Sequence, residues 1–316
     1  MSTSQSLFEG VVVLIAIIMI AVVLKKLGIF KQEYSLTFSH LVLYITLPAV
    51  IFSSLALQEF NTTFLTMSLI MALIELLVIF LAWLIATLLK FDSGKKGALM
   101  LVSAFGMTSF LGYPIIQQAF PGNALALEEA VVTSEIGVGL LLFILGPLIA
   151  MYYGESKVEG KAITASVKQF FTSPIFFSII AGIGVSFIPL NHDGIVFNMV
   201  FKFFKLVGDA NLLLVAFTIG LIFEFKGIKN IALFIGIVVV LKLFLKPFLA
   251  LVLTDSSLFT EMMREIVFIE TALPSAILTA VFAKQYNCRP DLVSTAIMIT
   301  LILSIATVSL SFIYFF

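Results

Sequence analysis

Long apolar stretches restrict the fold of this sequence more than any other feature. A helix needs about 20 predominantly apolar residues to cross a bilayer, and ten stretches approach or exceed that length: 7–24, 37–57, 64–89, 97–120, 125–152, 173–189, 197–223, 231–253, 264–283 and 292–316. Residues are 61% hydrophobic and 11% charged, whereas soluble domains carry about 25% charged residues. The sequence therefore predicts an all-α integral membrane protein with ten transmembrane helices.

Other compositional features narrow the class of protein. The 18 basic and 18 acidic residues cancel, so charge gives no reason to expect a nucleic acid partner. One cysteine, Cys288, excludes an internal disulfide, and the two histidines, His40 and His192, lie far apart in the sequence. No His-Glu-x-x-His helix or Walker loop occurs. We expect no enzyme activity, no cofactor and no metal site.

The basic residues predict the orientation of the chain. With the N-terminus outside, the cytoplasmic connectors hold 13 of the 18 basic residues: Lys25, Lys26, Lys31, Lys90, Lys95, Lys96, Lys157, Lys161, Lys168, Lys226, Lys229, Lys284 and Arg289. Cytoplasmic loops are enriched in lysine and arginine. We expect a multi-pass protein of the plasma (inner) membrane with both termini extracytoplasmic and with the longest connector, 153–169, in the cytoplasm.

Two of the apolar stretches contain helix-breaking residues. Gly112 and Pro114 interrupt the fourth stretch, and Pro274 interrupts the ninth. Inside a bilayer, irregular backbone is tolerated where it is buried in protein or lines a wet cavity. The half-helices that begin at such breaks, with N–H groups around 112–116 and 274–277, would form an anion site. The alternative is that both prolines merely kink ordinary helices.

The positions of these breaks indicate an internal repeat. Pro48 precedes Pro114 by 66 residues, and the segment 212–214 precedes Pro274 by about the same distance. Residues 1–152 and 170–316 thus resemble two five-span units joined by the cytoplasmic connector 153–169. Because each unit has an odd number of spans, the second enters the membrane inverted. Inverted repeats build alternating-access carriers that bind substrate near the bilayer midplane.

Ionisable residues within the spans are further functional candidates, because each is costly in lipid when unpaired. Glu75 lies about 11 residues into the third span, roughly 16 Å along the helix. Glu135 and Lys242 are at similar depth, Lys246 lies one turn after Lys242, and Glu270 precedes Pro274 by one turn. Glu75 and Lys242 occupy related positions in the two repeats and are predicted to approach each other. The alternatives are a structural ion pair and, for Lys246, a side chain that snorkels outward.

Four motifs in a characteristic order resemble the auxin efflux carrier family. They are LPAVIF at 47–52, FLGYP at 110–114, LKLFLKP at 241–247, and LPSA at 273–276 followed by AKQY at 283–286. The likeness covers essentially the whole chain. That family includes bacterial permeases for malate-like acids and belongs to the bile acid/auxin/arsenite transporter superfamily.

The resemblance implies an elevator-like carrier in which spans four and nine cross at their broken points. A scaffold, often dimeric, would consist of spans one, two, six and seven. A mobile transport domain would consist of spans three to five and eight to ten. Two positions depart from the family pattern. Met107 stands where asparagine is common, and the proline expected in span seven is missing near Leu213.

The sequence and the resemblance together predict a secondary active transporter of a small organic anion, a mono- or dicarboxylate such as malate or an auxin-like acid. The bilayer, a coupling proton or sodium ion and a second copy of the chain are the other expected partners. The alternatives are a sodium-coupled symporter of the bile-acid type and a non-transporting membrane sensor. Glu75, Glu135 and Glu270 are the predicted coupling residues. The predicted substrate contacts are Thr108, Ser109, Gly112, Tyr113, Pro114, Lys242, Pro274 and Ser275.

Overall fold

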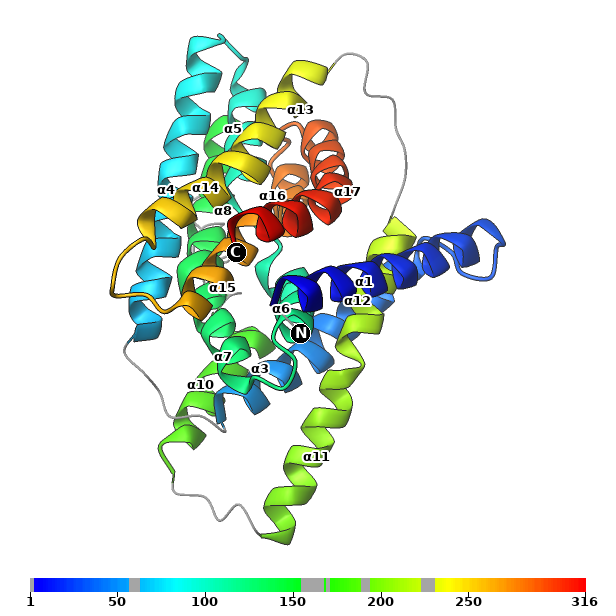
Figure 1. Cartoon of the computed structure of the whole chain (residues 1–316). Coiled ribbons are helices and arrows are strands. Elements are labelled where there is room, and N and C mark those ends of the chain that lie inside the picture. Colours follow the sequence, from blue (N-terminus) through cyan, green and yellow to red (C-terminus); the bar gives the residue numbers. More distant parts are fainter. Residues whose placement is uncertain (1–2, 57–62, 155–167, 169–170, 189–193, 223–230) are drawn as a thin grey trace. The chain divides into compact units, whose positions relative to one another are not determined.

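A computed structural model describes residues 3–56, 63–154, 168, 171–188, 194–222 and 231–316 (Figure 1). Every regular element within these residues is a helix, and one isolated antiparallel bridge joins Gly106 to Ser275. Seven helical runs are long and apolar enough to cross a membrane: Phe8–Lys26, Tyr34–Ala56, Phe64–Leu88, Ala124–Tyr153, Phe197–Leu221, Ala232–Leu253 and Pro290–Phe315. The structure therefore supports the predicted all-α integral membrane protein.

The other three expected spans contain shorter helices. The sixth is α10 (Pro174–Ser186). The fourth is divided among α5 (Ser93–Ala104), the π-helical segment η2 (Thr108–Gly112) and α6 (Tyr113–Ala119). The ninth is divided between α15 (Glu261–Ala272) and α16 (Leu278–Gln285). Helix length alone thus gives seven candidate crossings in the described part of the chain, and ten crossings stay a prediction.

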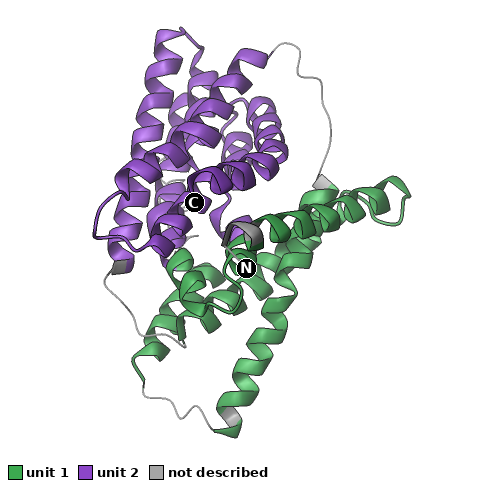
Figure 2. Cartoon of the chain, viewed as in Figure 1, with its two compact units in different colours: residues 1–62, 113–131, 171–224 green, residues 63–112, 132–170, 225–316 purple. Residues whose placement is uncertain are grey.

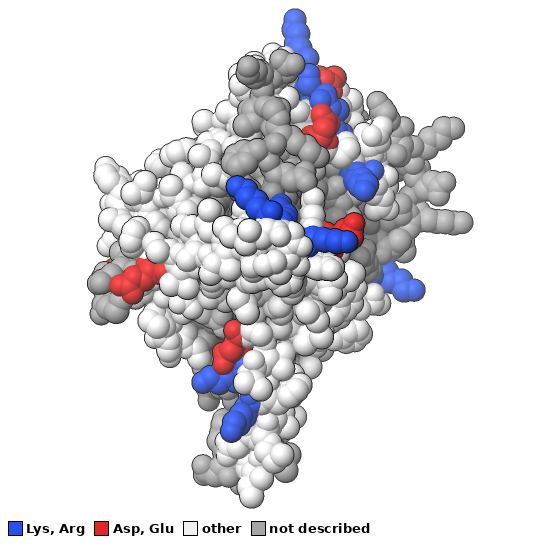
Figure 3. Space-filling model, turned by 90° about the vertical axis from the view of Figure 1, so that its right-hand side faces the viewer, with Lys and Arg blue, Asp and Glu red and all other residues white. Residues whose placement is uncertain are grey.

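Exposed side chains on the long helices are largely apolar. Leu69 on α4 (Thr63–Leu88), Phe203 on α11 (Ile195–Asp209) and Leu310 on α17 (Pro290–Phe315) are among the exposed large hydrophobic residues. On the face drawn in Figure 3, charged side chains form scattered groups on a mostly uncharged surface. Such a surface is stable in lipid, where no water penalises apolar exposure.

The chain forms two compact units, each assembled from separate parts of the sequence (Figure 2). The first contains residues 1–62, 113–131 and 171–224, and the second contains residues 63–112, 132–170 and 225–316. The chain passes from the second unit to the first between Gly112 and Tyr113, and returns between Val131 and Val132.

In the first unit, close helix contacts depend on small residues. α1 (Thr3–Lys26) packs on α12 (Asn211–Ile222), and α3 (Leu47–Ala56) packs on α10. A Cβ on Gly220 would lie 2.6 Å from that of Ala21, and one on Gly182 would lie 2.8 Å from that of Leu55. Small residues let membrane helices approach closely, because packing rather than the hydrophobic effect drives their association. α2 (Tyr34–Leu41), the π-helical η1 (Val42–Thr46), α6, most of α7 (Ala124–Val132) and α11 complete this unit.

In the second unit, α4 packs against both α5 and the π-helical segment η3 (Thr133–Gly139). Gly137 permits the contact with η3, since a Cβ there would lie 2.8 Å from the Ser68 carbonyl oxygen and 2.9 Å from the Met71 Cβ. The remaining helices of this unit are α8 (Leu140–Tyr153), α13 (Ala232–Val239), η4 (Val240–Leu245), α14 (Lys246–Leu253), α15, α16 and α17. α14 packs on α15, and α17 packs on both α15 and α16.

Of the four π-helical segments in the part of the chain that the structure describes, three end two residues before a proline: Pro48, Pro114 and Pro247. Proline has no N–H to donate and its ring clashes with the preceding turn. The helix responds by widening, so that Leu47 N–H donates to Val42 O and Lys246 N–H to Leu241 O, five residues back. These prolines therefore widen helices that continue through them.

The position of the fourth-span break differs from the prediction. Pro114 does not break the helix, because η2 and α6 run without interruption from Thr108 to Ala119 and η2 absorbs the missing hydrogen bond. The helix instead ends at Ala104, and the extended backbone at Phe105 leads into η2. The ninth-span break lies where it was predicted, between Ala272 and Leu278.

Candidate functional site

The two breaks lie side by side within the second unit. Residues 105–107 run antiparallel to residues 274–276, with Met107 N–H donating to Pro274 O and Ala276 N–H donating to Phe105 O, both at 2.9 Å. The backbone N–H and C=O groups left without helical partners at the two breaks therefore hydrogen-bond to one another, as they must where no water is present. The pairing holds four helix ends together: the C-termini of α5 and α15 and the N-termini of η2 and α16.

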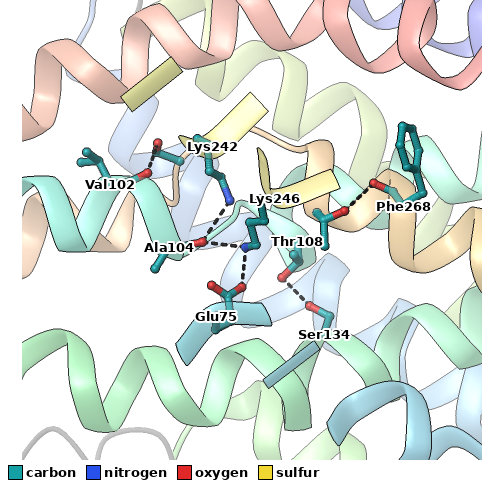
Figure 4. A network of polar contacts seen from close by, with 10 residues as sticks. Glu75, Val102, Ala104, Thr108, Ser134, Lys242, Lys246 and Phe268 are labelled. Carbon is teal, nitrogen blue, oxygen red and sulfur yellow. Dashed lines mark hydrogen bonds and ion pairs between the residues drawn. The ribbon is translucent and has the colours of Figure 1, made fainter. Parts of the chain in front are cut away.

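Two lysines meet the C-terminal end of α5 (Figure 4). Lys246 Nζ donates to Ala104 O at 2.6 Å, and Lys242 Nζ donates to the same oxygen at 3.1 Å. Both side chains are fully buried. A helix C-terminus carries partial negative charge, which favours cations there. Gly106 leaves room for this arrangement, because a Cβ at that position would lie 3.0 Å from Lys242 Nζ.

Glu75 forms its ion pair with Lys246, while Lys242, the predicted neighbour, lies near enough for an electrostatic interaction with Glu75. Lys246 Nζ lies 2.5 Å from Glu75 Oε1, and both side chains have zero exposure. Lys246 therefore does not snorkel outward. The i,i+4 spacing places both lysines on one helix face, and the sequence could not decide which of them contacts the carboxylate. Lys242 has no ion pair of its own among the described residues.

A second polar group joins the start of η2 to η3. Ser134 Oγ donates to Thr108 Oγ1 at 2.5 Å, and Ser109 Oγ donates to Glu135 Oε1 at 2.5 Å. Thr108 and Ser109 begin η2, where the first helical N–H groups have no intrahelical acceptor. Ser134 was not among the predicted site residues. It could have been recognised from the sequence as a hydroxyl residue next to Glu135 within an apolar span.

Glu270 lies in the last turn of α15 and is fully buried. Neither carboxyl oxygen has a hydrogen-bond partner among the described residues. Its charged neighbours within the unit are Glu135, Glu75 and Lys246. A Cβ on Gly112 would lie 3.9 Å from Glu270 Oε1, so the carboxyl group lies close to η2. A bare carboxyl group in this position is costly as an anion.

Two predicted substrate contacts have internal partners instead. The Gly112 N–H donates to Met107 O at 3.2 Å, so it is not one of the free N–H groups expected at the break. Ser275 Oγ donates to Val102 O at 2.6 Å, while Ser275 N–H donates to Thr300 Oγ1 at 3.2 Å. Thr300, which the sequence reasoning missed, ties α17 to the break.

The remaining predicted contacts are divided between the units. Pro274 belongs to the bridged segment and accepts from Met107. Tyr113 and Pro114 are buried at the start of α6 in the first unit. Within the described residues, no group of three or more histidine, cysteine or acidic side chains is arranged to hold a metal ion.

A family model described as membrane transport protein matches residues 6–314. The chain belongs to this family, the auxin efflux carrier-like transporters. The family prediction from the four motifs is confirmed.

Two curated relatives of this transporter are themselves uncharacterized transporters. One, from Methanocaldococcus jannaschii, is 25% identical over 308 residues, covering 96% of each chain. The other, from Methanothermobacter thermautotrophicus, is 25% identical over 304 residues, also covering 96% of each chain. The similarity extends through both halves of the membrane transporter, so the paired breaks and the buried lysines lie within the matched region.

Proposed function

We propose that this transporter is a secondary active carrier for a small organic anion, a mono- or dicarboxylate such as malate or an auxin-like acid. The observation that carries the proposal is the buried Lys242 beside the paired breaks, whose Nζ donates to a backbone carbonyl and forms no ion pair within the described part of the chain. A buried charge is costly without a counter-ion. A substrate carboxylate would supply that counter-ion, and the N-terminus of η2 would add favourable dipole charge.

The division of the chain into two units supports an elevator-type mechanism. The expected scaffold spans one, two, six and seven fall into the first unit, as α1 to α3 and α10 to α12. The paired breaks and all three candidate coupling carboxyls fall into the second unit. In the proposal the second unit carries the solute across the membrane, the two halves of the chain are inverted repeats, and the first unit forms a homodimer in the plasma membrane.

Glu270 is the proposed site of the coupling proton. The three candidate carboxyls Glu75, Glu135 and Glu270 share the unit with the buried Lys242 and Lys246. Among the described residues, Glu270 is the candidate whose two oxygens both lack a hydrogen-bond partner. Protonation removes a desolvated charge at that point. Glu270→Gln should therefore abolish the pH dependence of uptake, whereas the exposed Glu261→Gln should leave it unchanged.

Ligand-induced thermal stabilisation tests the substrate class. A ligand that binds the native state raises the unfolding temperature by mass action. We expect malate, malonate, oxalate or indole-3-acetate to stabilise the purified protein and their amides to have no effect. Lys242→Gln should remove the stabilisation. If amides stabilise as well as acids do, or if Lys242→Gln binds anions normally, the proposed anion site is wrong.

A sodium-coupled symporter is the second candidate, because the bare Glu270 oxygens are also suitable ligands for a hard cation. Strict dependence of anion binding on sodium would favour it over proton coupling. The lysine ammoniums already occupy the negative end of α5, which opposes a second cation at that end. Anion binding without transport in proteoliposomes would favour a membrane sensor.

A further inference from the structure

Two adjoining cavities in the second unit are lined by η4, α14, α15 and α17 and by the connection between α14 and α15. A polar pocket of about 540 Å³ is formed around the connection between α14 and α15, with Asp255, Glu261 and Arg264 among its lining residues. An apolar groove of about 400 Å³ is lined by η4, α14, α15 and α17. Phe315 lines both cavities, so the polar pocket and the apolar groove adjoin.

The polar pocket presents charges of both signs. Arg264 Nη2 lies 3.3 Å from Asp255 Oδ1, and the Asp255 side chain is 76% exposed. Such exposed pairs are weak and exchange readily with other partners. The buried Nε of Arg264 has no hydrogen-bond partner among the described residues. The Arg264 side chain is 32% exposed, so the accessible part of its guanidinium offers donors to a ligand, while Asp255 and the exposed Glu261 supply acceptors.

The apolar groove runs along the helical span that contains η4. Val240 and Phe244 of η4 line it together with Phe248 of α14. At a rise of about 1.5 Å per residue, Phe248 lies roughly 8 Å and Val240 roughly 20 Å along the helix from the end of α14 at Leu253. The groove thus extends along the candidate span Ala232–Leu253, from the end near the polar pocket toward the middle of that span.

We propose that these cavities bind one zwitterionic phospholipid whose headgroup carries a primary ammonium. Its phosphate would accept hydrogen bonds from Arg264, its ammonium would donate to Asp255 and Glu261, and one acyl chain would fill the groove. The pocket selects this class by charge: a purely anionic headgroup meets two carboxylates, and a choline headgroup has no N–H to donate.

Native mass spectrometry of the full chain in detergent, titrated with lipids of matched acyl chains, tests the headgroup assignment. We expect phosphatidylethanolamine to bind more tightly than phosphatidylglycerol or phosphatidylcholine. Arg264→Gln should weaken phosphatidylethanolamine binding about tenfold, because it removes a charge-assisted hydrogen bond to the phosphate. Arg289→Gln is the matched control, because it removes the only other arginine, which lies outside both cavities, and it should leave binding unchanged.

Two milder variants keep the test informative if Arg264→Gln folds poorly. Glu261→Gln, at an exposed position, should reduce the preference for phosphatidylethanolamine over phosphatidylcholine. Val240→Trp should obstruct the groove and weaken binding, whereas Val252→Trp, at a comparably exposed valine of the same span outside the groove, should not. Equal binding of all three lipids would overturn the proposal. So would equal effects of Arg264→Gln and Arg289→Gln, or of Val240→Trp and Val252→Trp.

Discussion

Replacing Lys246 with methionine should strongly destabilise the second unit. The variant leaves the Glu75 carboxyl buried at zero exposure without the ammonium that now lies 2.5 Å away. Removing one member of a buried ion pair typically costs about 3–5 kcal/mol, because the remaining charge is uncompensated. The Ala104 carbonyl keeps Lys242 as a donor, so the cost arises mainly at Glu75.

A double-mutant cycle separates this pair from general packing effects. Glu75→Leu with Lys246→Met replaces both charges by apolar groups, which is often close to neutral for a buried pair. The double variant should therefore be more stable than Lys246→Met alone, with a coupling free energy of at least about 2 kcal/mol. Denaturant unfolding of the purified protein, followed by its helical signal, gives the free energies.

Lys95→Met is the matched control for this cycle. Lys95 forms an exposed pair with Asp92 at 3.2 Å in the same unit, and such pairs contribute about 0–1 kcal/mol. If Lys246→Met is no more destabilising than Lys95→Met, or if the two changes at the buried pair are simply additive, the burial argument is refuted.

Three further predictions concern packing, reactivity and orientation. Gly137→Ala should cost about 1–3 kcal/mol, since its Cβ meets the backbone of α4 at 2.8 Å, whereas Gly236→Ala, with open space around it, should be neutral or stabilising in unfolding measurements. Burial raises the pKa of the Cys288 thiol to about 12, so maleimide should label it at neutral pH after denaturation and not before. Reporters should be cytoplasmic within 153–169 and extracytoplasmic after Phe316, and the reverse at either place would contradict the predicted orientation.

The sequence predicted the long helices well, because apolar length is a local property. The third expected span, 64–89, corresponds to α4. The ninth-span break was predicted correctly, since Pro274 has no π-helical turn to absorb it. The fourth-span break was misplaced because Gly112 and Pro114 are stronger local signals than residues 105–107, whose extended backbone depends on pairing with a segment about 170 residues away.

The polar partners at the breaks could not be predicted to the same extent. Buried charges are recognisable in a sequence by their cost in lipid, which is how Glu75, Lys242 and Glu270 became candidates. Which groups pair depends on helix rotation and packing, and a shift of one turn separates Lys242 from Lys246. Thr300 went unnoticed because a hydroxyl in a membrane helix commonly bonds to its own backbone, as Thr300 also does to Ala296 O.

Counterflow of a labelled dicarboxylate in proteoliposomes tests the central claim most directly. Vesicles loaded with unlabelled malate should accumulate external labelled malate transiently when they contain the wild-type protein. Vesicles with Lys242→Gln should not, although this variant retains the Glu75–Lys246 ion pair and should stay folded. Undiminished counterflow by Lys242→Gln would contradict the anion site at the paired breaks, and accumulation of neutral solutes with no carboxylate transported would contradict the proposed substrate class.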